Sequence, residues 1–469
     1  MTMKKTIYGS LLAMATILMN SCDIEMVPKG QTTLESGKEL EYLLNYLEVK
    51  DDPGTDLSVI VNESYGQEFT TVKQLISNTN TLISAYLSYN EKVDRPNLAS
   101  KDNRYTSIYS AINTLNVALG KIDGTDADQQ MRARVKAEAH IKRAWLHFLA
   151  ANIYAAQYDP STAASKGGIA YVTDYIMDQK EQLPLDKVYE LILEDLDDEY
   201  INALPDKAKS VVRCSKATGN AIKARVLMQM KRYNEALSYA EKSLSQYCVL
   251  EDRLPMIESG SWLLLSTSEN NLLYVSSYSC SWWIPFCDNL SLEAIALFED
   301  GDLTLEYGDD GYGGDLWSEF YGESSTGIKG ARSFIGYDTY KNPWGLTVES
   351  VKYIAAECLI RSGQIEKGLT HVNDVRKLRI HPDNYQDFSA STEKEAMEKL
   401  QQAKFIEFLM TFENFFDRKR WNTEDNYKKT IVRDMPEVGT YSISPDSPLW
   451  ILPIPLAVMN NNPSFKQNI

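Results

Sequence analysis

The sequence is poor in histidine, in closely paired cysteines and in positive charge. It has 4 histidines, 6 cysteines without a Cys-x-x-Cys pair, and 48 lysines and arginines against 65 acidic residues. Zinc domains need closely spaced cysteines or histidines, so their absence argues against a structural zinc site. A net charge of −17 argues against nucleic acid as a partner, because phosphate binding needs a basic face. Motifs of P-loop NTPases, G-x-S-x-G hydrolases and H-E-x-x-H metalloproteases are also absent.

Long apolar runs are absent too, and the one short run lies near the start of the chain. It extends over 13 residues, 7–19, behind two lysines, whereas a membrane-spanning helix needs about 20 residues. A basic start, a short apolar stretch and then small or polar residues describe a secretory signal. Because small Ser21 precedes Cys22, we expect residues 1–21 to be removed and Cys22 to carry a lipid. Ordinary signal cleavage and a retained anchor helix are the alternatives, since Met19 and Asn20 fit a lipobox poorly.

Helical periodicity is strong in three parts of the remaining chain. Apolar residues recur at spacings of three and four within about 105–157, 185–247 and 347–421, which predicts antiparallel helical hairpins. Two hairpins superpose with a shift of 132 (369 − 237), and their small residues near the turn resemble the tetratricopeptide repeat. Trp145, Phe148 and Trp421 lie within these helical segments, so we expect them in the core.

Aromatic residues, by contrast, are plentiful, with 28 Tyr, 13 Phe and 8 Trp. Many lie in a loop-rich stretch, about 250–345, where helical periodicity fails and glycine, serine and aspartate are frequent. Flat aromatic faces are the surfaces on which sugar rings stack. We therefore expect a ligand-binding aromatic platform drawn from Trp262, Trp282, Trp283, Trp317, Tyr312 and Tyr321. The alternative is that these side chains form a small core of their own.

Two further features of this stretch have a structural and a functional interpretation. The acidic segment 298–315 suggests calcium, but Leu305 stands where an EF-hand loop needs its sixth-position glycine, so a solvated loop is favoured. Cys280 and Cys287 are the pair best placed for a local disulfide, although a chain of this size does not need one.

A series of sequence blocks then resembles the SusD/RagB family of outer-membrane nutrient-capture lipoproteins. The blocks cover nearly the whole chain in the family's order, behind the expected lipid site. They are Tyr109-x-x-Ile112-x-x-x-Asn116, "AEAHIKRAWLHF" (137–148), "VYELILEDLDDE", "SKATGNAIKARVLMQMKRYNEAL", "AAECLIRSGQIEKGLTHVNDVR" with Asn373 and Arg376, "FFDRKRW" ending at Trp421, and "LWILPIP…NNNPSFKQN". Departures occur at 411–414 and at Tyr154-Ala155, and they make the chain a divergent member.

The resemblance implies a mainly α fold, in which tetratricopeptide-like hairpins form a right-handed superhelical frame around a loop-rich insertion. It implies a lipidated linker at 22–35, one SusD-like domain at 36–469, and a lipid-anchored location on the outer surface of the outer membrane. The expected partners are a SusC-like TonB-dependent transporter, over which the protein acts as a lid, and an oligosaccharide, with a peptide as the alternative ligand. No catalytic residue, metal or cofactor is implied. A helical-repeat scaffold for proteins and a surface glycoside hydrolase with two carboxylates are the competing functions.

Overall fold

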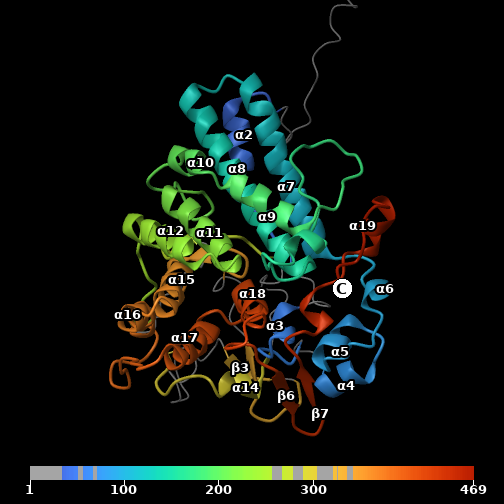
Figure 1. The fold of residues 1–469 in the computed structure, drawn as a ribbon, viewed down its shortest axis with the longest axis vertical. Helices are drawn as coiled ribbons and strands as arrows, with labels where there is room; N and C mark the ends of the chain where they lie inside the picture. The colour runs from blue at the N-terminus through green and yellow to red at the C-terminus, as the bar shows by residue number, and fades with distance from the viewer. Residues whose placement is uncertain are drawn as a thin grey trace, which may run out of the picture.

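Helices dominate the architecture, and the mainly α class is confirmed (Figure 1). The structure is a computed structural model that describes residues 34–50, 56–66, 71–255, 267–277, 289–303, 321–324, 326–334 and 342–469. The hairpin of α7 (Asn103–Lys121) and α8 (Gln129–Tyr154) lies at one end of the long axis. Asp128 caps α8 by accepting a hydrogen bond from the Met131 amide, which explains why the helix begins there.

The two hairpins that superpose in sequence are also matched in structure. The first consists of α11 (Lys216–Gln229) and α12 (Tyr233–Gln246), the second of α15 (Val348–Arg361) and α16 (Ile365–Arg376). Corresponding helices begin 132 residues apart (348 − 216 and 365 − 233). The small residue in the second hairpin allows the close approach, because a Cβ on Gly368 would lie 2.7 Å from the Ala356 carbonyl oxygen. In Figure 1, α12 and α15 lie side by side, so the hairpins stack along one flank.

The helix that carries the "FFDRKRW" block, α18 (Phe412–Trp421), is held to this flank by buried charges. Asp417 contacts three cations: Arg225 of α11 at 2.7 Å, Lys404 of α17 (Glu393–Glu407) at 2.6 Å and Arg420 at 3.2 Å. Arg420 also donates two hydrogen bonds to Glu357 of α15, and all these side chains are at most 1% exposed. Buried pairs are costly to break, so this network fixes how the four helices meet.

Shorter helices and three small sheets complete the structure. The helices are α2 (Gly37–Leu43), α3 (Leu57–Ile60), α4 (Val72–Ser77), α5 (Leu82–Leu87), α6 (Arg95–Leu98), α9 (Leu185–Asp195), α10 (Asp198–Ala203), α14 (Leu292–Ile295) and α19 (Leu456–Asn461), with 3-10 turns at Ile122–Gly124, Ala163–Ser165 and Pro448–Trp450. The antiparallel sheets are β1 (Asn271–Leu273) with β5 (Leu346–Thr347), β2 (Asn289–Leu290) with β4 (Arg332–Phe334) and β3 (Tyr321–Glu323), and β6 (Ile431–Met435) with β7 (Gly439–Ile443). Short strands and loops therefore replace helical hairpins in the described parts of 250–345.

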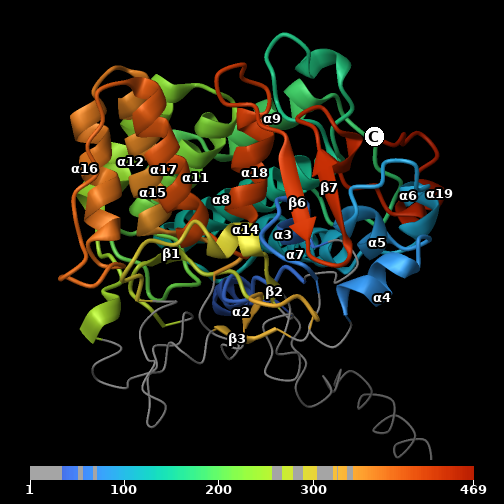
Figure 2. The same cartoon turned by 90° about the horizontal axis from the view of Figure 1, so that it is seen from below.

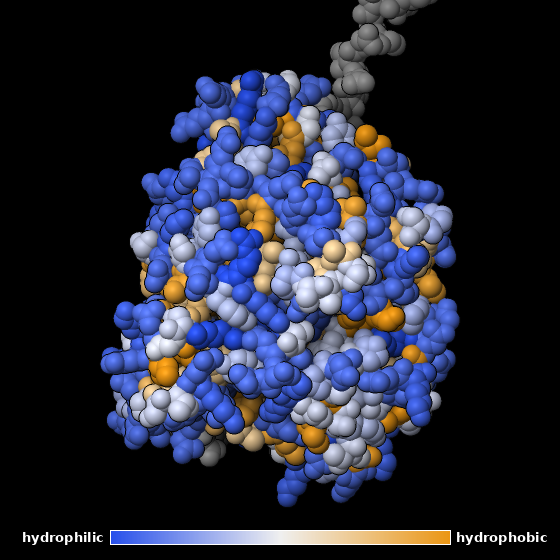
Figure 3. Space-filling view, in the orientation of Figure 1, coloured by the Kyte–Doolittle hydropathy of each residue, from blue (hydrophilic) through white to orange (hydrophobic). Residues whose placement is uncertain are grey.

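The core and the surface follow the expected division. Trp145 and Phe148 are fully buried and Trp421 is 5% exposed, as predicted from their helical spacing. The face shown in Figure 3 is mainly hydrophilic, with small separate apolar areas. Among the helices in the described ranges, we find none with the length and apolar character that a membrane span requires.

Candidate functional site

The three-stranded sheet gathers the ends of the loop-rich stretch at one place. Its strands pair in the order β2-β4-β3, with Asn289 opposite Ser333 and Tyr321 opposite Phe334. Because the pairing is antiparallel, the starts of β2 and β3 and the end of β4 lie at the same end of the sheet. The segments 278–288, 304–320 and 335–341 therefore join the described structure at neighbouring points.

Residues 62–66 attach this sheet to the helical frame. The Tyr65 amide donates to the Asn289 carbonyl oxygen at 2.8 Å, and the Asn289 amide donates to Gly66 at 3.2 Å. The Ser291 amide donates to Glu63 at 2.9 Å. Gly66 has a φ of +98°, which a residue with a side chain rarely adopts, so glycine permits the turn at the end of this segment. The sheet is consequently held by backbone contacts to a part of the chain more than 200 residues earlier.

The second sheet fixes the other ends of two of these segments. Asn342 accepts a hydrogen bond from the Val275 amide at 3.1 Å and donates to the Leu273 carbonyl oxygen at 2.7 Å. The Ser276 amide donates to Leu47 at 3.2 Å, two residues before the chain leaves the described range. The end of segment 335–341 and the start of segment 278–288 are thus fixed beside β1.

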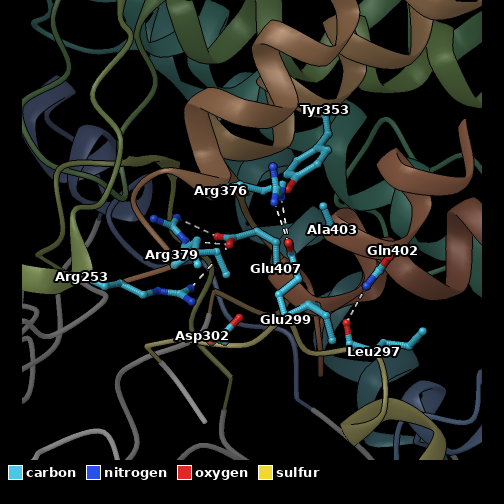
Figure 4. A pocket seen from close by; sticks show the side chains of 12 residues that line it. Arg253, Leu297, Glu299, Asp302, Tyr353, Arg376, Arg379, Gln402, Ala403 and Glu407 are labelled. Atoms are coloured by element: carbon cyan, nitrogen blue, oxygen red, sulfur yellow. Dashed lines mark hydrogen bonds and ion pairs between the residues drawn. The ribbon is translucent and has the colours of Figure 1, made fainter. Parts of the chain in front are cut away.

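A charged cavity marks the junction between the loop-rich stretch and α16 and α17 (Figure 4). Arg376 contacts both carboxylate oxygens of Glu299, at 2.8 and 2.5 Å, and the Leu303 amide donates to the Arg379 carbonyl oxygen at 2.9 Å. Arg379 in turn contacts Glu407 at 2.7 Å. The cavity measures about 20 Å³, which suits one water molecule rather than a sugar. We conclude that this cluster fixes the segment that leads into 304–320.

The predicted site residues lie almost entirely outside the described ranges. Cys22, Trp262, Trp282, Trp283, Tyr312 and Trp317 belong to this group, as do Cys280 and Cys287. Tyr321 opens β3, where its backbone pairs with Phe334. Cys214, Cys248 and Cys358 are free thiols. Of the acidic segment, only 298–303 is described, and within the described part of the chain no three His, Cys, Asp or Glu side chains gather as a metal site.

Chain length alone limits how far two of the predicted tryptophans lie from the sheet. Trp317 is four residues before Tyr321, and Trp283 is six residues before Asn289. An extended chain spans at most about 3.6 Å per residue, so their Cα atoms lie within about 15 Å and about 22 Å of the sheet end. Sequence patterns could not find this convergence, because the strands have two or three residues and their partners are distant in the chain.

Two family models match the chain in separate regions. The model described as "Starch-binding associating with outer membrane" matches residues 27–228, and the model described as "SusD family" matches residues 351–469. A search of curated proteins found no match.

Several solved structures share the fold. A SusD superfamily protein from Bacteroides thetaiotaomicron has a TM-score of 0.66 at 16% identity, over 92% of this chain and 100% of that chain. A SusD-like carbohydrate binding protein from Bacteroides vulgatus has a TM-score of 0.67 at 14% identity, over 92% and 98%. A SusD homolog from Bacteroides thetaiotaomicron has a TM-score of 0.63 at 16% identity, again over 92% and 98%. At these identities the likeness establishes the fold alone.

Proposed function

The chain belongs to the SusD/RagB family, and from this premise we propose that it is a surface lipoprotein that captures an oligosaccharide for import. The observation that carries the proposal is the convergence of three aromatic-bearing segments at one end of the β2-β4-β3 sheet. Rigid anchoring of all three segments suits a binding surface, because a preorganised site loses less entropy when its ligand binds. The solved relative named as carbohydrate binding supports the ligand class.

The chemistry of the segments favours a sugar over a peptide. Trp282 and Trp283 lie in 278–288, and Trp317 lies in 304–320. Indole rings bury the apolar C–H faces of a sugar, while amides and carboxylates bond its hydroxyl rim. We propose a binding protein that releases its ligand unchanged, acting as a lid over a SusC-like TonB-dependent transporter.

Alanine substitutions at the tryptophans test the platform. We expect Trp282→Ala, Trp283→Ala or Trp317→Ala to weaken glycan binding at least about tenfold in one or more cases, since buried aromatic contacts act as hot spots. Calorimetry with the full chain would measure this. If the two adjacent tryptophans continue a strand, their rings face opposite sides and only one of them contributes. Unchanged affinity in all three variants would remove the platform from the proposal.

Lipidation of Cys22 requires a separate test. We propose that cleavage after Ser21 leaves Cys22 as the lipidated first residue, with the linker 22–35 between lipid and domain. Metabolic labelling with a palmitate analogue should mark the wild-type protein, and Cys22→Ala should abolish the label and release the protein from the membrane fraction. Label that persists in Cys22→Ala would disprove this anchor without affecting glycan binding.

A further inference from the structure

Two exposed tyrosines stand beside the start of segment 278–288. Tyr42 is 57% exposed on α2, and Tyr46, four residues later, is 64% exposed. Apart from Tyr175, every other aromatic side chain with a described position is buried or partly buried. Aromatic rings rarely remain in water without a reason of this kind, because burying each ring would contribute stability. The pair therefore calls for an explanation.

The position of the pair relates it to the candidate site. Leu47 and Val49 exchange backbone hydrogen bonds with Ser276, and Glu48 forms a parallel bridge with Ser276. The first residue of segment 278–288 follows two residues after this bridge. Figure 2 shows α2 on the same side of the molecule as β1, β2 and β3, with α9 on the opposite side. A ligand at the sheet end would thus have Tyr42 and Tyr46 within its surroundings.

The helix beneath the tyrosines is held firmly. Ser36 and Glu39 form a capping box at its start, and the Gly37 amide donates to Asp126 at 2.9 Å. A Cβ on Gly37 would lie 2.5 Å from Cβ of Ala127, so only glycine allows α2 to meet the α7–α8 turn this closely. Leu40 and Leu44 are fully buried below. The exposed rings are consequently presented on a fixed support, which lowers the entropic cost of binding.

Polar groups suited to sugar hydroxyls surround the rings. The Tyr46 hydroxyl donates to Glu48 at 2.6 Å, and the Glu48 side chain is 17% exposed. This hydrogen bond raises the pKa of Tyr46 to about 12, which keeps the phenol neutral at all physiological pH values. Lys50 lies 3.8 Å from Glu48, and the Lys38 ammonium lies 5.8 Å from the Tyr42 ring centroid. Flat faces with a carboxylate and ammonium donors at the rim are the usual composition of a carbohydrate subsite.

We propose that Tyr42, Tyr46 and Glu48 form an accessory carbohydrate subsite that binds the extension of a long glycan chain. The inference rests on the proposed function, because the main platform must hold one part of the same chain. A short ligand fills only the main platform, whereas a polymer reaches both places. The accessory subsite would therefore favour long chains over their fragments.

Affinity electrophoresis with polymers tests the subsite. The probes are soluble starch, pectin, xylan and mucin glycans, followed by the trisaccharide of whichever polymer retards the wild-type chain. We expect Tyr42→Ala and Tyr46→Ala each to weaken polymer binding about fivefold to tenfold and to leave trisaccharide affinity unchanged. Tyr42→Phe should retain wild-type binding, because it keeps the stacking face. Tyr175→Ala, in the connection between α8 and α9, is the matched control, since Tyr175 is 42% exposed.

The outcomes separate the inference from the function on which it rests. Polymer binding that is unchanged in both alanine variants, or lost equally for polymer and trisaccharide, overturns the accessory subsite and leaves glycan capture standing. A wild-type chain that none of the four polymers retards overturns the proposed function and the subsite with it. Melting temperatures within 1–2 °C of wild type, about the effect of a few tenths of a kcal/mol, confirm that the variants are folded.

Discussion

Replacement of Asp417 by asparagine is expected to lower the free energy of unfolding by about 3–5 kcal/mol. The carboxylate is 1% exposed and neutralises Arg225, Lys404 and Arg420 at the meeting point of four helices. Although burial alone would raise the pKa of the Asp417 carboxyl, these charges hold it well below the usual range. Asparagine has a similar shape but no charge, so three buried cations would be left with too few counter-charges. Urea denaturation at pH 7, followed by circular dichroism, measures the loss.

The pH dependence and a matched control make this prediction specific. A depressed pKa stabilises the fold above the unfolded value of about 3.9, and this stability is lost as the pH falls below it. The gap between wild type and Asp417→Asn should therefore narrow below about pH 4. Asp425→Asn is the control, because Asp425 is 92% exposed and pairs only with exposed Lys428 among described contacts, so it should cost less than about 0.5 kcal/mol. Equal costs for the two variants would contradict a structural role for the network.

Lys419, next to this network, is expected to make stability rise with pH. Its ammonium is buried and donates to the carbonyl oxygens of Asn152 and Ala155 at the end of α8. Burial lowers the pKa of Lys419 to about 7, whereas an unfolded lysine has about 10.4. Between these values the unfolded chain binds more protons, so raising the pH stabilises the folded state. The term amounts to about 1.5 kcal/mol between pH 7 and pH 8.5.

Comparison with Lys419→Met isolates that term. Other groups titrate in the same range, but they are common to both proteins and cancel in the difference. We expect the stability of wild type relative to Lys419→Met to rise by about 1.5 kcal/mol from pH 7 to 8.5 in urea denaturation. Exposed Lys428→Met should run parallel to wild type over this range. A difference between wild type and Lys419→Met that does not change with pH would show that Lys419 stays charged.

Local sequence patterns were sufficient for the helical frame. The three- and four-residue spacing of apolar side chains requires only neighbours within one helix, so α7, α8, α11, α12, α15 and α16 could be expected from it. The shift of 132 residues was equally visible, because the small residues near each turn are needed wherever two helices approach closely. Buried Trp145 and Phe148 followed from the same periodicity.

The arrangement around the candidate site could not be predicted in this way. Asn289 pairs with Ser333 and with Gly66, and no periodicity in two- or three-residue strands identifies such distant partners. Arg376 was recognised as a family residue, but its partner Glu299 lies 77 residues earlier in a stretch without helical pattern. Tyr42 and Tyr46 were two among 28 tyrosines, and only exposure separates them from the buried majority.

Glycan capture without turnover is the central proposal, and one measurement addresses it directly. The full-length protein is titrated by calorimetry with the polysaccharide that retards it most in affinity electrophoresis, and the same mixture is then analysed by chromatography after prolonged incubation. We expect saturable binding and a polysaccharide whose chain-length distribution is unchanged. Shorter products would indicate a surface glycoside hydrolase, and an absence of binding to every glycan tested would contradict carbohydrate capture altogether.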